Sequence, residues 1–176
     1  TTFEHDLAGN TTARSLANGM REEWQYDGYG RIERYRALRD GTLEGEASYS
    51  YQAGQLASMH DSIRAATEQY AYDAAGRLVL TSYGYGETRS LAYDVRSRVT
   101  AEVLAVPGQV LFDIGHEYDL ANRRIRTQDR AAQALLVEHV VAAGRVVETR
   151  YGNGLVRAHA YDGAGLIVGF ETRNAL

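Results

Sequence analysis

A short phrase recurs along this chain, and its recurrence constrains the fold more than any other feature. The phrase runs tyrosine, aspartate, two variable residues, glycine, a basic residue and an aliphatic residue, as in YDGYGRI and YDAAGRL. The better copies begin at Tyr26, Tyr72, Tyr93, Tyr118 and Tyr161, and weaker copies begin at His5, Tyr51 and Val140. Successive starts are 21, 25, 21, 21, 25, 22 and 21 residues apart. Spacing of this size predicts an array of one supersecondary unit rather than a conventional globular domain.

Each repeat has the pattern of a β-hairpin. Glu68, Tyr70 and Tyr72 share one face of an extended segment, and a second alternating segment follows over residues 78–83. Period-two alternation rich in Tyr, Val and Thr on both sides of a glycine-containing turn is typical of paired antiparallel strands.

The phrase itself supplies the turn. An aspartate at its start accepts a hydrogen bond from a backbone N–H two residues on, and the glycine near its end takes a positive φ. The residues predicted to have this structural role are Tyr26, Asp27, Gly30, Tyr72, Asp73, Gly76, Tyr93, Asp94, Tyr118, Asp119, Asn122, Tyr161, Asp162 and Gly165. Asn122 suits left-handed geometry, so Asn122→Gly is expected to be neutral or mildly stabilising, whereas Ser97 fits the same column poorly.

A second family of turns links one hairpin to the next, at residues 17–19, 39–41, 83–86, 107–108 and 152–154. Two turns per repeat leave room for strands of about 7–8 residues, so we expect about 14–16 antiparallel strands in up-and-down order. The predicted fold is all-β, a twisted sheet that winds into a spiral and in which the tyrosine rings stack on one another. Residues 129–141 (DRAAQALLVEHVV) are the best helical candidate, but the repeat phase runs through them and favours strand and loop.

Composition excludes several classes of function. All 19 basic residues are arginine, yet 23 acidic residues are mixed among them and the net charge is −4, which argues against nucleic-acid binding. No cysteine is present for a disulfide or a thiolate metal site, and no apolar run is long enough to span a bilayer. Arginine pairs with carboxylates and stacks on tyrosine faces, so these residues suit cross-strand ladders.

The sequence offers no catalytic, cofactor-binding or metal-ligating constellation. The glycines at 163, 165 and 169 echo a dinucleotide loop but begin in a turn and open no helix. The five histidines show no i, i+4 zinc pairing, and the repeated aspartates lie at turn starts, where backbone hydrogen bonding is the simpler role. We therefore predict a non-enzyme without cofactors.

The phased copies resemble the YD-repeat family, also called Rhs repeats, most closely at Tyr26, Tyr72 and Tyr161, and the resemblance covers essentially the whole chain. Members include bacterial polymorphic toxins, the B and C components of insecticidal toxin complexes, and teneurins. In the toxins the repeats form a hollow cocoon around a C-terminal toxic domain. The family's aspartate-based self-cleavage segment and the variable toxin domain do not occur here, so neither autoproteolysis nor a toxic activity is assigned.

The resemblance implies a structural role. Residues 1–176 would form a single array of about eight repeats, a segment of a longer shell that encapsulates a toxic cargo until delivery. The implied partners are further YD repeats of the same or a neighbouring chain, the enclosed toxin domain, and a secretion-system spike or adaptor. The implied location is outside a bacterial cell, by secretion or delivery, after a cytoplasmic stage. The alternative is an extracellular adhesion or carbohydrate-binding module built on the same sheet.

Overall fold

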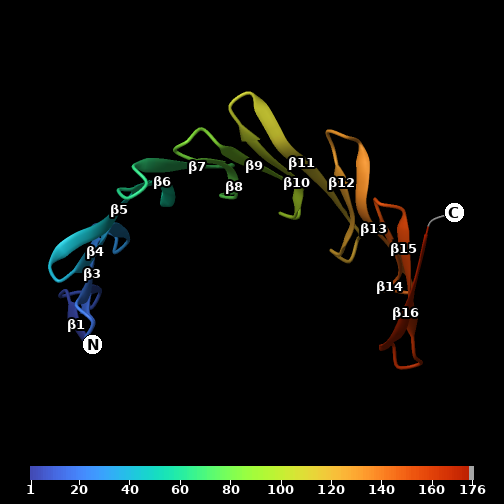
Figure 1. The fold of residues 1–176 in the computed structure, drawn as a ribbon, viewed down its shortest axis with the longest axis horizontal. Coiled ribbons are helices and arrows are strands. Elements are labelled where there is room, and N and C mark those ends of the chain that lie inside the picture. The colour runs from blue at the N-terminus through green and yellow to red at the C-terminus, as the bar shows by residue number, and fades with distance from the viewer. Residues whose placement is uncertain (175–176) are drawn as a thin grey trace. The chain divides into compact units, whose positions relative to one another are not determined.

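The structure is a computed structural model that describes residues 1–174, and those residues form strands and turns only (Figure 1). The strands are β1 (Thr2–His5), β2 (Thr11–Ser15), β3 (Met20–Tyr26), β4 (Ile32–Arg39), β5 (Thr42–Gln52), β6 (Gln55–Asp61), β7 (Ala66–Tyr72), β8 (Leu78–Ser82), β9 (Thr88–Tyr93), β10 (Val99–Val106), β11 (Gln109–Tyr118), β12 (Arg124–Asp129), β13 (Ala134–Ala142), β14 (Arg145–Tyr151), β15 (Leu155–Tyr161) and β16 (Ile167–Asn174). No helix of the described chain has the length and apolar character needed to cross a membrane.

The strands follow one another in sequence order through one 16-stranded antiparallel sheet. This order confirms the predicted all-β, up-and-down architecture. The helical candidate, residues 129–141, forms turn and strand, as the repeat phase predicts. Residues 130–133 form a turn and β13 follows it, with Glu138 paired to Arg126 of β12.

The chain divides into two compact units, Thr1–Thr88 and the part from Arg89 onward. Each unit contains four copies of the repeated phrase, those that begin at 5, 26, 51 and 72 and those that begin at 93, 118, 140 and 161. Within each unit, the phrase turns lie at one end of the strands and the linking turns at the other, because successive strands run in opposite directions.

The tyrosine of the phrase lies at a break in the strand register. In the β3–β4 hairpin, Gln25 pairs with Arg34 but Tyr26 pairs with Ile32, so one residue of β4 is left over. The same shift occurs at Tyr72, Tyr118 and Tyr161. An additional residue on one strand is a β-bulge, which strengthens the local right-handed twist. Twist is therefore built into the repeat itself.

The described residues bury few side chains. The buried apolar residues are Ala13, Ala101 and Val156, all small or medium in size, and the buried polar ones are Thr81 and Thr149. Within each unit the strands form a single layer, whereas a sheet in an ordinary domain buries one face against a second layer. Stability within a unit therefore comes from contacts between neighbouring strands and turns.

Candidate functional site

Each Tyr-Asp phrase forms a turn organised by its aspartate. After β7, the Asp73 amide donates to the Arg77 carbonyl and the Gly76 amide donates to the Asp73 carbonyl, both at 2.9 Å. The Asp73 carboxylate accepts the amides of Ala75 at 2.9 Å and Arg77 at 3.0 Å. Gly76 has φ +79°, in the left-handed region that glycine adopts without steric cost. The turn is therefore specified by local contacts.

The same carboxylate also binds the arginine that ends the phrase. Oδ2 of Asp73 accepts a hydrogen bond from Nε of Arg77 at 2.7 Å. Equivalent bonds join Asp27 to Arg31 at 2.8 Å, Asp94 to Arg98 at 2.6 Å, and Asp119 to Arg123 at 2.7 Å. Asp162 differs because residue 166 is leucine, and its carboxylate accepts the Leu166 amide at 2.8 Å.

These contacts hold the carboxylates in the charged form. The Arg77 guanidinium and then the Arg77 amide lower the pKa of Asp73 below its ordinary value of 3.8. The Arg31 guanidinium does the same for the pKa of Asp27, and the Arg123 amide is the largest cause of the lowered pKa of Asp119. A general acid or base works best with a pKa near the operating pH, so these aspartates are placed for hydrogen bonding rather than proton transfer.

A residue with positive φ occupies the same column in every copy of the phrase. The values are Gly9 +87°, Gly30 +77°, Gly54 +83°, Gly76 +79°, Ser97 +61°, Asn122 +65°, Gly144 +77° and Gly165 +86°. Two weak copies are shorter: Ala53-Gly54 and Ala143-Gly144 both have positive φ at two consecutive residues, the geometry of a two-residue type I′ hairpin turn. Ser97 adopts the left-handed conformation although a side chain there costs about 1–2 kcal/mol.

The tyrosines connect each phrase to the strand before it. Tyr26 donates its hydroxyl hydrogen to the Thr11 carbonyl at 2.8 Å. The same bond joins Tyr51 to Ile32 (2.8 Å), Tyr118 to Val99 (2.8 Å) and Tyr161 to Val146 (2.7 Å). Each acceptor is at or next to the start of a strand that follows the preceding phrase turn. Tyr72 pairs with Leu78 across its hairpin, and Tyr93 ends β9.

Arginines connect each phrase turn to the phrase turn that follows it. Arg98 donates to the Asp119 carbonyl in the next phrase turn at 3.0 Å, and its guanidinium carbon lies 4.6 Å from the centre of the Tyr118 ring. Arg31 lies 4.2 Å over the Tyr51 ring, and Arg145 lies 5.5 Å over the Tyr161 ring. We call this arrangement the turn clasp: the Asp–Arg pair of one turn and the Tyr of the next, as in Asp94, Arg98 and Tyr118.

Two details of the clasp differ from the sequence expectation. The faces of Tyr51, Tyr118 and Tyr161 contact arginines rather than neighbouring tyrosine rings, because successive phrase tyrosines are separated by an intervening strand. Among residues 1–174 the ring pair recorded is Trp24–Tyr35, with centroids 5.8 Å apart. Asn122 has a second role besides its left-handed conformation, because its side chain accepts hydrogen bonds from the preceding turn.

Asn122 receives two hydrogen bonds from the preceding turn. Its Oδ1 accepts from Arg98 at 3.2 Å and from Arg96 at 3.3 Å. Asn122→Gly would relieve the strain of φ +65° but would remove both contacts. We therefore replace the expectation of a neutral change with one of mild destabilisation. No sequence pattern signals this contact, because the two arginines precede Asn122 by more than 20 positions.

The strand face that carries the phrase tyrosines, here called the tyrosine face, holds a second row of repeated positions. Five of its members lie two residues before a phrase and one, His139, lies one residue before the phrase at Val140, and each pairs directly with a residue of the next strand. The six are Trp24, Tyr49, Tyr70, His116, His139 and His159. In the first unit the pairs are Trp24–Tyr35, Tyr49–Met59 and Tyr70–Thr81. In the second unit they are His116–Thr127, His139–Thr149 and His159–Phe170. The sequence analysis did not recognise this row, although the column is visible once the phrases are aligned.

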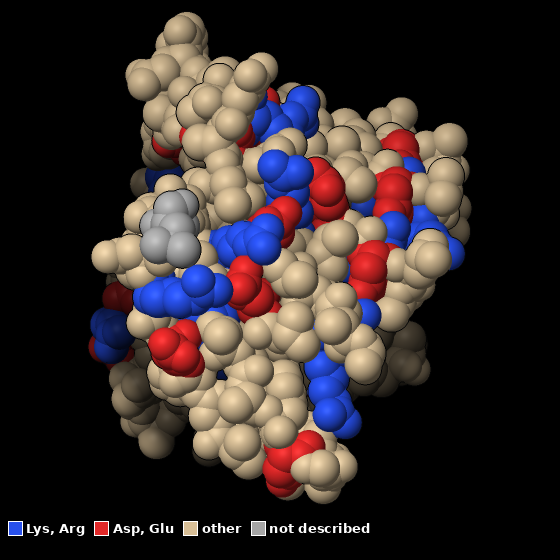
Figure 2. Space-filling model, turned by 90° about the vertical axis from the view of Figure 1, so that its right-hand side faces the viewer, with Lys and Arg blue, Asp and Glu red and all other residues tan. Residues whose placement is uncertain are grey.

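The opposite face, here called the ion-pair face, carries networks of arginine and carboxylate. In the first unit Arg21 contacts Glu4 at 2.7 Å and Glu23 at 2.9 Å, and in the second Arg150 contacts Glu138 at 3.1 Å and Glu148 at 2.7 Å. In Figure 2, acidic and basic side chains lie interspersed rather than in separate patches.

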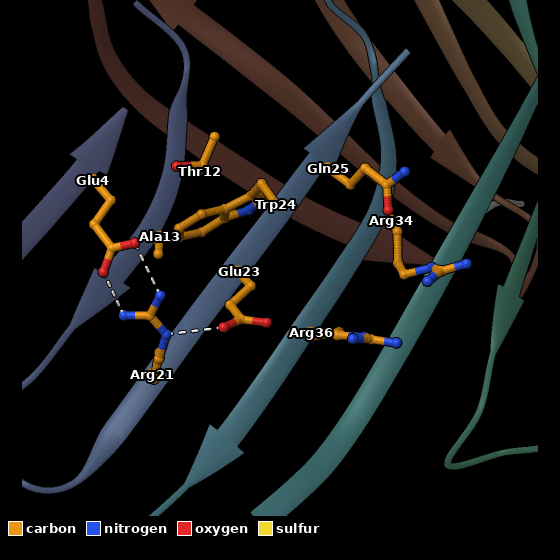
Figure 3. Close-up of a pocket in the computed structure, with 9 residues that line it drawn as sticks. All are labelled: Glu4, Thr12, Ala13, Arg21, Glu23, Trp24, Gln25, Arg34 and Arg36. Atoms are coloured by element: carbon orange, nitrogen blue, oxygen red, sulfur yellow. Dashed lines mark hydrogen bonds and ion pairs between the residues drawn. The ribbon is translucent and has the colours of Figure 1, made fainter. Parts of the chain in front are cut away.

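A cavity of about 270 Å³ opens on the ion-pair face of the first unit, between β2, β3 and β4 (Figure 3). Figure 3 shows Arg21 held between Glu4 and Glu23, with Arg34 and Arg36 on the neighbouring strand. Arg36 binds Glu46 at 2.6 Å. The arginines that line this cavity all have carboxylate partners, Arg21 inside the lining and Arg34 and Arg36 in Glu46. In residues 1–174 no group of three or more His, Asp or Glu side chains is placed to hold a metal ion.

Comparison with known proteins identifies the fold. No protein-family model matches the sequence, and no curated protein matches it either. A crystal structure of TcdB2-TccC3-Cdc42 matches 98% of this chain at 17% identity and a TM-score of 0.64, and a structure of the Photorhabdus luminescens Tc holotoxin pore with mutant TccC3 matches 98% at 15% identity and 0.57. A crystal structure of TcdB2-TccC3 matches 98% at 16% identity and 0.52.

This chain covers 10%, 11% and 12% of the three matched chains, in the same order. At such identities the likeness concerns the fold alone. The resemblance drawn from the repeated phrase is therefore confirmed at the level of fold: the chain has the structure of a segment of these Tc toxin chains.

Proposed function

We propose that this chain is a non-catalytic wall segment of a shell that encloses a toxic polypeptide until delivery. The turn clasp carries this proposal. It joins neighbouring repeats through side chains whose roles are structural, and a wall needs such joints wherever adjacent hairpins meet. In repeat proteins, stability is the sum of each unit's own contribution and its contacts with its neighbours.

The burial pattern supports the same proposal. A sheet of single-layer units with few buried apolar residues leaves both faces without a covering layer among the described residues. We infer that further repeats and an enclosed polypeptide supply those contacts in the full assembly. The fold shared with Tc toxin chains supports this inference, because this chain matches about a tenth of each of them.

The test is protection of a downstream segment from protease. The chain would be expressed together with the coding sequence that follows it, and limited proteolysis would be compared for the wild type and for a double substitution, Arg98→Ala with Tyr118→Phe. We expect a C-terminal fragment that is protected in the wild type and degraded in the clasp variant. Arg39→Ala at the linking-turn end of β4, where Arg39 pairs with Glu44, is the matched control. Equal protection in the clasp variant would contradict the wall function.

The second candidate is carbohydrate binding by exposed aromatic rings. Tyr29 is 87% exposed, Tyr85 67% and Phe3 55%, and Arg31 lies 5.0 Å over the Tyr29 ring. Trp24 is the single tryptophan, so its fluorescence reports directly on the first unit. A saturable change on titration with polysaccharides, lost in Tyr29→Ala, would favour this function over the wall.

A further inference from the structure

The tyrosine face of the second unit gathers basic side chains that have no carboxylate partner. Fifteen of the nineteen arginines lie within ion-pair distance of an aspartate or glutamate. Arg96, Arg124, Arg145 and Arg157 do not among residues 1–174, and all four lie in this unit. Arg96 donates to Asn122 in the next phrase turn and Arg145 lies over the Tyr161 ring, so we consider Arg124 and Arg157. An arginine without a carboxylate partner can bind an anion that another molecule supplies.

Arg124 lies beside the histidine row. It lowers the pKa of both His116 and His139, after burial as the largest cause in each, so its charge is close to both rings. A cavity of about 440 Å³ between β12 and β13 is lined by Arg124, Arg126, Thr127, Leu136, Val137 and His139. The cavity therefore places a guanidinium and an imidazole around one space.

Arg157 extends the basic surface toward β15. It pairs with Thr149 across the β14–β15 register, and its guanidinium carbon lies 4.7 Å from the centre of the Phe170 ring. Its Nε is buried and has no hydrogen-bond partner within the described chain. An unpaired buried donor is costly, and an anion is the ligand that would satisfy it.

Hydroxyl groups orient the imidazoles. Nδ1 of His116 lies 3.2 Å from Oγ1 of Thr127, and Nδ1 of His139 lies 3.0 Å from Oγ1 of Thr149. Oγ1 of Thr149 also lies 3.1 Å from Nε2 of His159. When Nδ1 of His139 accepts the threonine hydrogen, its Nε2 carries the hydrogen and is free to donate to a ligand.

From these contacts we propose that His116, His139, His159, Arg124 and Arg157 form a proton-dependent site for the carboxylates of an extended acidic polypeptide. The spacing favours this ligand. The three histidines lie on every second strand, so their backbones are about 9.5 Å apart at the usual strand separation. Three residues of an extended chain span about 10 Å, so a peptide that crosses the strands with an acidic residue at every third position matches the row.

Protons strengthen this site because binding favours the charged imidazole. The other charged groups on this face near His116 are Glu102, which raises the pKa of His116, and Arg89, which pairs with Glu102 at 2.8 Å. Arg126, which also lines the cavity, pairs with Glu117, and the pair Arg150–Glu138 lies on the ion-pair face. A bound carboxylate adds negative charge beside the rings and raises their pKa, so affinity increases as the pH falls.

Fluorescence anisotropy of a labelled peptide with glutamate at every third residue tests the site, with the chain at pH 5.5 and pH 7.5. We expect tighter binding at pH 5.5, by up to about tenfold for each histidine whose pKa rises by one unit when the peptide binds. The glutamine version of the peptide should not bind. Arg124→Gln should weaken binding about tenfold, a loss of about 1.4 kcal/mol. His60→Gln should have no effect, because His60 lies on the ion-pair face of the first unit, hydrogen-bonded to Thr67.

A second readout separates binding from folding. NMR titration of the imidazole resonances should show the pKa values of His116 and His139 rising when the peptide is added, and His139→Gln should remove the response at residue 139 without loss of the β-sheet signal in circular dichroism. Binding that is equal at the two pH values, or unchanged in Arg124→Gln, would overturn the proposal. Tighter binding of an oligothymidylate of equal charge would also overturn it, in favour of a nucleic acid. None of these outcomes depends on whether the chain forms a shell wall.

Discussion

Replacing Gly76 with valine measures how strongly the phrase turn depends on left-handed geometry. Gly76 has φ +79°, and a side chain in this conformation costs about 1–2 kcal/mol, more for a β-branched residue. A Cβ atom at residue 76 would also lie 3.3 Å from Nε2 of Gln55. That amide nitrogen donates to the Gly76 carbonyl at 2.9 Å and so joins two neighbouring phrase turns.

The two costs add. If Gln55 moves away, its hydrogen bond is lost, which contributes about 1 kcal/mol. Together with the backbone strain, Gly76→Val should lower the free energy of unfolding by about 2–4 kcal/mol. Urea unfolding followed by circular dichroism gives this difference directly when the slope of the transition is unchanged.

The matched control lies in the same unit and in the same kind of turn. Gly28 has no positive φ, a Cβ there meets nothing within 4 Å, and the equivalent position of a later phrase is already occupied by Val95. Gly28→Val should therefore change the free energy of unfolding by less than about 0.5 kcal/mol. If the two valine variants were equally stable, the turn argument would be wrong.

Three further predictions concern the clasp and the histidine row. Tyr118→Phe removes the hydroxyl that donates to Val99 while keeping the ring, and should cost about 1 kcal/mol in urea unfolding. Arg98→Lys loses the planar geometry that serves an aspartate, a carbonyl and a tyrosine ring at once, and should cost about 1–2 kcal/mol by the same assay. Burial lowers the pKa of His116 and His139 below 6.5, so the unfolded chain binds more protons; the free energy of unfolding should fall as the pH drops below about 6.5.

Each of these predictions has its own control. Tyr29→Phe should leave stability unchanged, since Tyr29 is 87% exposed. If Tyr29→Phe and Tyr118→Phe lowered the free energy of unfolding equally, the Tyr118 hydrogen bond would not be the cause. Arg39→Lys should also be neutral, because Arg39 contributes one exposed ion pair with Glu44. The free energy of unfolding should vary less with pH when His116 and His139 are both replaced by glutamine. If the variation persisted, other titratable groups would be its cause.

Much of the local structure was predictable from the sequence. The number of strands, the positions of the phrase turns and the strand character of residues 134–142 follow from the repeat, because each depends on contacts within a few residues. Asp73 and Gly76 illustrate the reason: one accepts amides two and four positions away, and the other adopts a φ that few residues tolerate. Such preferences act before any distant part of the chain is in place.

The partners across strands were not predictable in the same way. Trp24 faces Tyr35 and His116 faces Thr127, both 11 residues apart, whereas His139 faces Thr149, only 10 apart. Both kinds of hairpin include a bulge, and the difference arises because the turns at Ala53 and Ala143 are one residue shorter. Simple alternation carried through the turn would place an 11-residue partner on the wrong face.

The sequence alone thus determined the repeated hairpin and its turns, through short-range hydrogen bonding and backbone sterics. Only the tertiary structure decided that Arg98 reaches Tyr118 and Asn122, that Arg21 and Arg150 each meet two carboxylates on one face, and that three histidines share the other with Arg124. These contacts join residues on different strands or turns, and strand register, which bulges shift by a single residue, sets which of them meet.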